Sequence, residues 1–476
     1  MAERWLVGAL DYIPRWIEWQ MRVSRQPGCA IAIWHRGRPV LAQAFGHADL
    51  ARGQALTNEH RFRVASHSKT FTAAGLLRLR ETGHVRLDQP VGDFVSELHP
   101  DVARVTLSQL LSHSAGLVRD GFDAGQWQDR RPFLDEAAIR ADLAHGTTIP
   151  PNSRFKYSNH GYGLLGMVIA TITGEPYADW ITRAIVRPSG LADTVADAPV
   201  ADGKPLACGH SSDVLLGQRV VIPGDNPTRA LASATGFVST ASDLARFFGS
   251  LSPQARSSVL SVDSRREMAR RQWRDPHASL ERWYGLGTIS GTLAGWDWFG
   301  HSGGFQGHIT RTVVVPEQQL SVSVLTNASD GLAHPWLEGA LHILARFARD
   351  GAPPRRLALW NGRWCSLWGA FDLLPVGDDT VLVANPALAN PLQDASEITP
   401  GSVDRDGTAH GSIRLANGFA NHGESVRLER DARQRATTLW LGGNPLLPEA
   451  AARRELARRY GGDRSPRTPR KKGSRS

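Results

Sequence analysis

Hydrophobic residues recur with two different spacings along the chain, and the change of spacing predicts the order of its elements. Two β-rich runs around an Arg-Gly turn at 28–46 predict a hairpin. Stretches with helical spacing follow, separated by loops rich in Gly and Pro, at 69–82, 106–112, 161–173, 176–186 and 241–250. Near 284–327 the pattern returns to strands. Because strands lie at both ends of the helical stretch, the order predicts an α+β or mixed sandwich whose late strands complete the first sheet.

After this region the pattern changes again. Helical spacing at 336–349 precedes the Pro/Arg-rich segment "DGAPPRRLALWNGRW". Beyond it come short aromatic-bearing strands with Gly and Asp turns, in "WCSLWGAFDLLPVGDDTVLVAN", "HGSIRLANG", "GESVRLERD" and "ATTLWLGG". They predict a small antiparallel barrel or sandwich of about 100 residues. We expect a large mixed domain at 1–350, a linker at 351–357, a β-barrel domain at 358–460 and a disordered basic tail at 461–476.

Length and charge add little to this picture. The 476 residues are too many for one ordinary domain. The formal charge is +9, but the tail "GGDRSPRTPRKKGSRS" holds six basic residues and one acid, which leaves +4 for the rest. We expect the tail to be a solvated extension rather than a contact with an anionic surface. The body shows no basic stripe or nucleic-acid motif, so a nucleic-acid partner is not expected.

Cysteine usage and the N-terminus bear on the compartment. Cys29, Cys208 and Cys365 are widely spaced and form no CxxC pair, which indicates neither a disulfide framework nor a zinc site. A reducing, cytoplasmic location fits. The opening "MAERWLVGALDYIPRWIEWQMRV" has charges among its apolar positions, which argues against a signal peptide or membrane span. It predicts an amphipathic helix kinked near Pro14.

A serine and a lysine three residues apart begin one of the predicted helices, in "FRVASHSKTFTAAGLLRLRETG" at 62–83. Residues three apart lie on one helix face, so Lys69 can present its amine to Ser66. The apolar residues that follow would bury the amine and lower its pKa, as a base requires. Free N–H groups at the helix N-terminus would hold a developing oxyanion. This SxxK arrangement is typical of acylating serine enzymes.

The motif occurs twice, although the chain has only five lysines. The second match, Ser153 to Lys156, follows "TIPPN" in a Pro-rich loop with no apolar helix to desolvate the amine. We therefore favour Ser66 as the nucleophile. Taken in isolation, the match at Ser66 is equally well explained as a helix cap near a surface lysine.

The sequence "YSN" directly after Lys156 adds two polar groups. Tyr157 and Asn159 are two residues apart, so an extended segment would point both to one side. The tyrosine hydroxyl could relay a proton to a leaving group. The asparagine amide could donate to Lys69 or to a substrate carbonyl. In isolation "YSN" is better explained as a capping loop.

A third segment, "GHSGG" at 300–304, follows an aromatic strand. Its glycines, Gly303 and Gly304, would let a substrate approach the strand backbone, and the Gly304 N–H would be a second oxyanion donor. The segment also fits the GxSxG nucleophile elbow around Ser302. That elbow requires a helix directly after the serine, whereas "FQGHITRTVVV" is strand-like, so the elbow is disfavoured.

The three sites together resemble the serine β-lactamase and penicillin-binding-protein superfamily. SHSK (66–69), YSN (157–159) and HSG (301–303) follow its order of motifs. The branch it resembles most holds class C β-lactamases, D-aminopeptidases and β-lactamase-like esterases. The resemblance covers about residues 15 to 350, and its flanking segments are "VRLDQPVGDF", "TLSQLLSHSAGL", "ATGFVSTASDLARF" and "VSVLTN".

The resemblance implies a role for each matching residue. Ser66 would be the acylated nucleophile, Lys69 its base and Tyr157 a second acid/base. Substrate would be bound by Asn159 and by the HSG segment, with the N–H groups of Ser66 and Gly304 as the oxyanion hole. The implied fold is an antiparallel sheet flanked by helices, with a helical subdomain.

One position departs from the common pattern. The third motif commonly begins with lysine, whereas this chain has His301. Histidine is mostly neutral at pH 7, so carboxylate-bearing β-lactams and D-Ala-D-Ala peptides become less certain substrates. D-aminopeptidases of this branch are similar in having a histidine there and in carrying C-terminal β-barrels. The domain at 358–460 resembles such a lipocalin-like barrel.

The resulting hypothesis is a serine hydrolase that forms an acyl-enzyme on an amide or ester. The substrate would be a small molecule or short peptide: a D-amino-acid peptide, a β-lactam-like compound or a small ester, as in D-aminopeptidases, carboxypeptidases, β-lactamases and esterases. No cofactor, metal or membrane partner is expected, and nothing indicates the oligomeric state. The alternative is a penicillin-recognising binding protein on the same fold that does not hydrolyse its ligand.

Overall fold

The computed structural model describes residues 3–200, 202–214, 216–276, 278, 281–417 and 420–461. Within them the chain forms two compact units: residues 13–345, and residues 3–12 together with the residues from 346 onward. Helices α1 (Arg4–Ser24) and α10 (Ala333–Asp350) therefore each contribute to both units. The sequence-based domain boundaries stay a prediction, and the basic tail beyond Gly461 lies outside the described residues.

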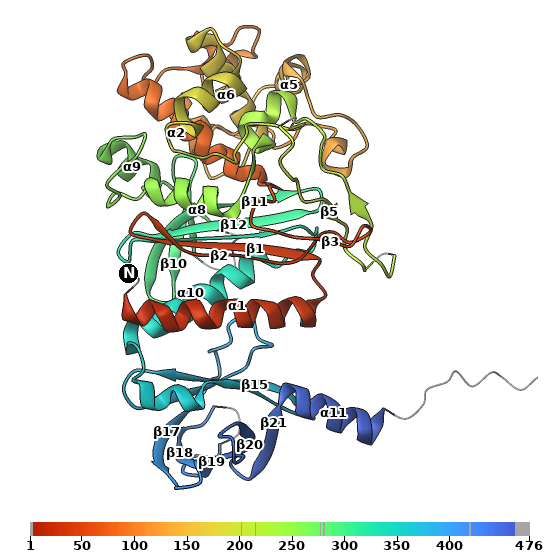
Figure 1. Ribbon diagram of the computed structural model, residues 1–476. Coiled ribbons are helices and arrows are strands. Elements are labelled where there is room, and N and C mark those ends of the chain that lie inside the picture. Colours follow the sequence, from red (N-terminus) through yellow and green to blue (C-terminus); the bar gives the residue numbers. More distant parts are fainter. Residues whose placement is uncertain are drawn as a thin grey trace, which may run out of the picture. The chain divides into compact units, whose positions relative to one another are not determined.

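The larger unit is built on a nine-stranded antiparallel sheet that joins the early and late strands of the unit (Figure 1). Strand β1 (Gly28–His35) lies between β2 (Arg38–Asp49) and β13 (Leu320–Thr326). The prediction that late strands complete the first sheet is therefore confirmed. The other strands are β3 (Gln54–Ala55) beside β2 and, beyond β13, β12 (His308–Val315), β11 (Trp296–Phe305), β10 (Ile289–Leu293), β9 (Arg282–Tyr284) and β8 (Trp273–Asp275).

The predicted hairpin is formed by β1 and β2 around a two-residue turn. Arg36 has φ of 52° and Gly37 has φ of 74°. Two successive residues with positive φ are the mark of a type I′ turn, whose twist matches the twist of the flanking strands. The Arg-Gly pair thus fixes the register in which His35 lies opposite Arg38, and an irregularity between Ile33 and Trp34 then shifts the pairing by one residue.

Helices occupy the chain between the hairpin and the late strands. They are α2 (Ser68–Glu81), α3 (Pro100–Ala103), α4 (Leu107–Leu111), α5 (Glu136–Leu143), α6 (Asn159–Thr173), α7 (Tyr177–Ile181), α8 (Ala241–Ser250) and α9 (Val262–Ala269). The short strands β4 (Phe62–Arg63), β5 (Gly209–His210), β6 (Val221–Ile222) and β7 (Val238–Ser239) form two small sheets among them. All five helical stretches predicted here have counterparts, and α1 runs through Pro14 without ending.

The sheet is covered on both faces (Figure 1). Helix α8 packs on β1, β12 and β13, with Phe247 and Phe248 fully buried. The other face is covered by α10 and by the part of α1 from residue 13 onward, where Trp16 and Trp336 have no exposed surface. These apolar faces account for much of the stability of the unit, because burial of each large side chain contributes about 1.5–3 kcal/mol.

The smaller unit contains a closed antiparallel barrel of eight strands, which confirms the barrel predicted from the sequence. Its strands are β14 (Gly362–Ser366), β15 (Gly369–Val376), β16 (Thr380–Ala384), β17 (Ser396–Val403), β18 (Ala409–Leu415), β19 (Ser425–Arg430), β20 (Ala436–Leu441) and β21 (Asn444–Pro448). The barrel core includes Leu357 and Trp360 from a short 3₁₀ helix at Arg355–Trp360. The segment predicted as a linker at 351–357 therefore supplies part of this core.

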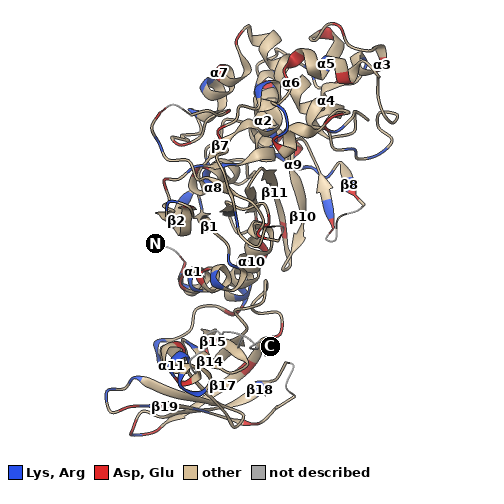
Figure 2. Cartoon of the chain, turned by 90° about the vertical axis from the view of Figure 1, so that its right-hand side faces the viewer, with Lys and Arg blue, Asp and Glu red and all other residues tan. Residues whose placement is uncertain are grey.

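Helix α11 (Glu449–Tyr460) follows the last barrel strand. Its exposed arginines include Arg453, Arg454, Arg458 and Arg459. Elsewhere Lys and Arg are interspersed with Asp and Glu along both units (Figure 2). This mixture agrees with the modest charge expected once the tail is set aside.

Candidate active site

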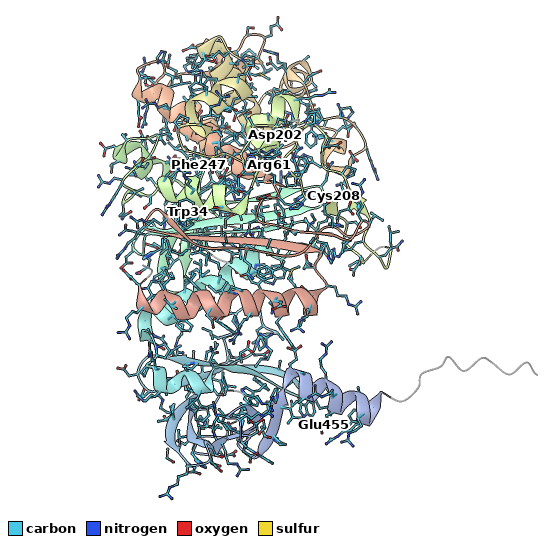
Figure 3. All side chains as sticks on the ribbon, viewed as in Figure 1. Trp34, Arg61, Asp202, Cys208, Phe247 and Glu455 are labelled. Carbon is cyan, nitrogen blue, oxygen red and sulfur yellow. The ribbon has the colours of Figure 1, made fainter. Side chains whose placement is uncertain are left out.

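Ser66 lies in a single 3₁₀ turn, Ala65–His67, that leads directly into α2. The chain enters this turn from β4, whose Phe62 and Arg63 pair with β7. Just before β4, Arg61 makes two hydrogen bonds of 2.9 and 2.7 Å to the carboxylate of Asp202 (Figure 3). The strand pairing and this ion pair fix the approach to the serine.

Ala65 has φ of 47°, in the left-handed region. A residue with a Cβ loses about 1 kcal/mol or more in this conformation. The surrounding packing must supply that energy, because Ala65 is completely buried. Strain of this kind is common where a backbone holds a reactive side chain in a fixed direction.

Helix α2 is buried on nearly all sides, and Lys69 has no exposed surface. Its Nζ lies 3.1 Å from Ser66 Oγ, 2.7 Å from Asn159 Oδ1 and 2.8 Å from the backbone oxygen of Ala234. Burial lowers the pKa of Lys69 well below its ordinary value. The sequence predicted this burial from the apolar residues that follow Lys69.

A neutral amine, which burial favours, can satisfy all three contacts of Lys69. Two N–H groups can donate to Asn159 Oδ1 and to the oxygen of Ala234, both of which only accept. The lone pair then faces Ser66 Oγ. An amine held in this way can remove the hydroxyl proton from Ser66.

Tyr157 approaches Ser66 from another side. Its hydroxyl donates to Ser66 Oγ over 2.8 Å. Removal of this hydroxyl from water raises the pKa of Tyr157 above its usual range. The ring lies 4.1 Å from the ring of His113, whose Nδ1 accepts from the N–H of Ser158. The tyrosine is thus a proton donor in a fixed position.

Asn159 begins α6 and connects Lys69 to a carboxylate. Its Nδ2 donates to Asp120 Oδ1 over 2.5 Å, so its Oδ1 must be the atom that accepts from Lys69. This direction is the reverse of the donation to Lys69 that the sequence suggested. Asp120 also accepts from Trp127 Nε1 at 3.0 Å, and Arg119 Nε lies 3.0 Å from its Oδ2.

Sequence reasoning missed Asp120. It lies on a loop with no regular spacing to the other site residues, and its link to Asn159 depends on tertiary structure. The segment "TLSQLLSHSAGL", which ends three residues earlier, was the available signal.

The third motif forms part of β11. His301 is 3% exposed, and burial together with the nearby His67 and Lys69 lowers its pKa well below the ordinary value. Gly303 packs against the segment that carries Ser66, because a Cβ there would lie 2.1 Å from the oxygen of Val64. Gly304 is exposed, and the nearest atom to a Cβ would be 3.7 Å away. Of the two glycines, Gly304 faces the open space.

These groups surround a cleft of about 590 Å³. Of the predicted site residues, Ser66, Tyr157, Asn159, His301 and Gly304 line it, while Lys69 lies behind Ser66 and Gly303 behind the strand edge. The other lining residues, which the sequence did not single out as site residues, are Arg119, Asp120, Trp127, Phe155, Asp275, Arg282, Trp283, Tyr284, Ile289 and Ser302.

The competing sequence matches lie in other settings. Ser153 is exposed and donates to the oxygen of Pro150 over 2.6 Å. Ser302 lies inside β11, and strand β12 rather than a helix follows it, so the nucleophile elbow is absent at this position.

The fold and the converging motifs define the class: a β-lactamase/transpeptidase-like domain with a C-terminal barrel. The sequence model of the family described as Beta-lactamase matches residues 13–341, and the chain belongs to this family. The resemblance drawn from the motifs is therefore confirmed.

Curated relatives are similar at modest identity. Penicillin-binding protein 4 of Amycolatopsis lactamdurans is 28% identical over 320 residues, which covers 63% of this chain and 81% of that protein. Protein flp of Staphylococcus aureus (strain N315) is 26% identical over 188 residues, 38% of this chain and 37% of flp.

Solved structures are similar to this chain in their fold. The octameric penicillin-binding protein homologue from Pyrococcus abyssi has a TM-score of 0.64 at 24% identity and covers 92% of this chain and 99% of its own. The D-amino acid amidase from Ochrobactrum anthropi SV3, in complex with D-phenylalanine, has a TM-score of 0.58 at 25% identity. The match covers 71% of this chain and 98% of the amidase chain.

Among the described residues, no helix is long and apolar enough to cross a membrane. Cys29, Cys208 and Cys365 are free thiols.

Proposed function

We propose that this protein is a serine hydrolase that cleaves an amide or ester bond through an acyl-enzyme on Ser66. The observation that carries the proposal is the setting of Lys69: a fully buried amine whose two N–H groups have carbonyl acceptors and whose third direction points at Ser66 Oγ. Membership of the Beta-lactamase family and the likeness to a D-amino acid amidase support it.

Acylation would begin with proton transfer from Ser66 Oγ to Lys69 Nζ, while Oγ forms a bond to the substrate carbonyl carbon. The carbonyl oxygen takes up the electron pair. The N–H groups of Ser66 and Gly304 would hold this oxyanion, and each such donor contributes about 3 kcal/mol to the transition state.

Collapse of the tetrahedral intermediate breaks the bond from carbon to the leaving nitrogen or oxygen. Tyr157 would give its hydroxyl proton to the leaving group and recover a proton from the Lys69 ammonium. Its raised pKa makes the neutral phenol the resting form, as this role requires. In deacylation, water attacks the ester carbon and gives its proton to Lys69, the base of the first step. The bond from carbon to Ser66 Oγ then breaks, and Ser66 Oγ takes this proton back from Lys69.

The charges of the cleft favour substrates without a carboxylate next to the scissile bond. His301 is buried and has a lowered pKa, so it offers no permanent cation. The two cleft arginines, Arg119 and Arg282, are each paired with an aspartate, Asp120 and Asp275. The aromatic walls suit an apolar side chain. The amidase neighbour is named for D-amino acids, so amides of D-amino acids with apolar side chains are, with short-chain esters, the first substrates to test.

The three free thiols support a reducing compartment such as the cytoplasm as the place of action. A small molecule or short peptide is the expected partner.

A fluorophosphonate probe tests the assignment directly. Wild type and Ser153→Ala should each gain the mass of one probe, on the peptide that contains Ser66, whereas Ser66→Ala should gain none. Labelling of Ser66→Ala at the wild-type rate would disprove the proposal. Hydrolysis of nitrocefin, nitrophenyl esters and D-amino-acid nitroanilides then ranks the substrates, and one equivalent of acyl-enzyme without release would instead indicate a binding protein.

A further inference from the structure

Strand β11 continues past the end of its neighbour β10. The last pair between them joins Ile289 to Gly300, whereas β11 runs on to Phe305 and stays paired with β12 on its other side. Within the described residues, the segment 301–305 therefore has one edge without a strand partner. An unpaired edge leaves N–H and C=O groups that need other partners. Three residues of this segment, His301, Ser302 and Gly304, line the cleft.

The imidazole of His301 lies against the backbone of Ser302. Its Nδ1 is 3.0 Å from the Ser302 nitrogen and 2.7 Å from the Ser302 carbonyl oxygen; without a proton it accepts from the N–H, and with a proton it donates to the oxygen. The ring therefore lies against the N–H and the C=O of Ser302, just past the point where β10 stops pairing with β11. Gly304, with the N–H assigned to the oxyanion, is two residues further along.

The second nitrogen of the ring is held by Tyr284. The Tyr284 hydroxyl lies 3.0 Å from His301 Nε2, and the two rings meet edge to face at 5.8 Å. Tyr284 is 2% exposed, its backbone pairs with Ile289, and its ring also packs on His113 at 4.6 Å. The tyrosine is thus a rigid support that reaches from β9 across the end of β10.

We propose that Tyr284 is a positioning residue: through His301 it fixes the Ser302 backbone and so the strand edge that carries the Gly304 N–H. This inference rests on the proposed function, because that function assigns the Gly304 N–H to the oxyanion hole. His301 is then a link inside the protein, both of whose ring nitrogens already have protein partners, rather than a group that binds the substrate.

Support of the strand edge affects the rate because an oxyanion donor stabilises the transition state only when it is correctly placed. The charge on the oxygen develops only in the transition state, so a displaced donor lowers kcat more than it raises KM. A misplacement of about 1 Å costs on the order of 100-fold in rate.

Tyr284→Phe removes the hydroxyl and keeps the ring. We expect kcat for a nitrophenyl ester to fall about 10- to 100-fold, with KM within about twofold of wild type. Tyr177→Phe is the matched control: it removes another buried hydroxyl, bonded to Thr72 Oγ1 at 2.6 Å, from a residue that does not line the cleft, and it should leave kcat unchanged. Equal kcat in the two variants would overturn the proposal.

A double-mutant cycle tests the route through the imidazole. If Tyr284 acts through His301, then Tyr284→Phe has no further effect on kcat once His301→Gln is present. Additive losses would show that the two residues act separately and would overturn the proposal. If Tyr284→Phe does not fold, His301→Gln alone tests the proposal. A kcat equal to wild type in His301→Gln would show that His301 does not position the strand edge and would overturn the proposal.

Crystal structures of wild type and Tyr284→Phe supply a readout that needs no activity. The Ser302 backbone and the Gly304 nitrogen should be displaced in the variant, and superimposable positions would overturn the proposal. Failure of the proposed function looks different, because the probe would then leave Ser66 of wild type unlabelled.

Discussion

The two Ser-x-x-Lys segments of this chain share a sequence pattern but have opposite environments. Ser66 and Lys69 lie in a 3₁₀ turn and a buried helix, with Nζ 3.1 Å from Oγ. Ser153 is exposed in a turn, and its hydroxyl donates to the oxygen of Pro150. The spacing alone therefore does not distinguish the two pairs; burial of the lysine and acceptors for its N–H groups do.

The backbone conformation just before each serine is similar in the two segments. Both serines follow a residue in the left-handed region, Ala65 with φ of 47° and Asn152 with φ of 59°. Asparagine adopts this conformation with little loss, whereas alanine does not. The strained residue precedes the serine of the cleft and the relaxed one precedes the surface serine, and strain of this kind is common where a backbone orients a reactive group.

The largest difference should appear when each lysine is replaced. Lys69→Met removes the proposed base and should lower the rate of acylation about 10²- to 10⁴-fold, the usual contribution of general-base catalysis. Lys156→Met should stay within twofold of wild type. The measurement is the rate of probe labelling at Ser66, followed by intact mass. Similar losses in both variants would mean that the two lysines do not differ in function.

The burial of Lys69 also predicts how stability depends on pH. Its pKa is well below the ordinary value in the folded protein and about 10.4 in the unfolded chain. Between these values the unfolded chain binds one proton more, so the free energy of unfolding rises with pH by about 1.4 kcal/mol per unit relative to a chain without this lysine. The gain is complete above the unfolded pKa.

Urea denaturation of wild type and Lys69→Met between pH 7 and 9 checks this slope. The difference in free energy of unfolding, wild type minus variant, should increase steadily with pH. A difference that is constant over this range would show that Lys69 titrates alike in both states.

A smaller effect concerns the carboxylate near the first pair. Asp120, held by Asn159 Nδ2, raises the pKa of Lys69 although burial lowers it more. Asp120→Asn should therefore lower this pKa further and move the acid limb of kcat/KM to lower pH. A pH profile of ester hydrolysis measures it; a limb moved to higher pH would contradict the assignment of Lys69 as the base.

The same contrast shows what the sequence could and could not predict. The apolar residues after Lys69 and the Pro-rich loop before Ser153 favoured the first pair in the sequence. The order of hairpin, helices and late strands predicted the sheet, because hydrophobic spacing reports which face of an element is buried. The helix at 161–173 was identified nearly to its ends, since Gly174 with φ of 69° terminates it.

Other features depend on contacts that no local pattern encodes. Asp120 and Tyr284 meet the predicted residues only after the loop at 119–120 and strand β9 have folded against the cleft. Strands β17 and β21 of the barrel were not predicted. β17 contains Pro400 and Gly401, and β21 contains two prolines, so their alternation is weak, and the closure of the barrel rather than propensity makes them strands.

The smallest predicted effect tests the backbone side of the comparison. Asn152→Ala places a Cβ-bearing residue with no polar side chain at φ of 59° and removes the hydrogen bond that Asn152 Oδ1 accepts from Ser114 Oγ at 3.2 Å. We expect a loss of about 1 kcal/mol in the free energy of unfolding, measured by urea denaturation, because alanine tolerates this conformation poorly. Ester hydrolysis should stay within twofold of wild type, since Ser153 is exposed and outside the cleft lining. Lower activity at unchanged stability would show that the second segment takes part in the reaction, and the distinction between the two pairs would no longer hold.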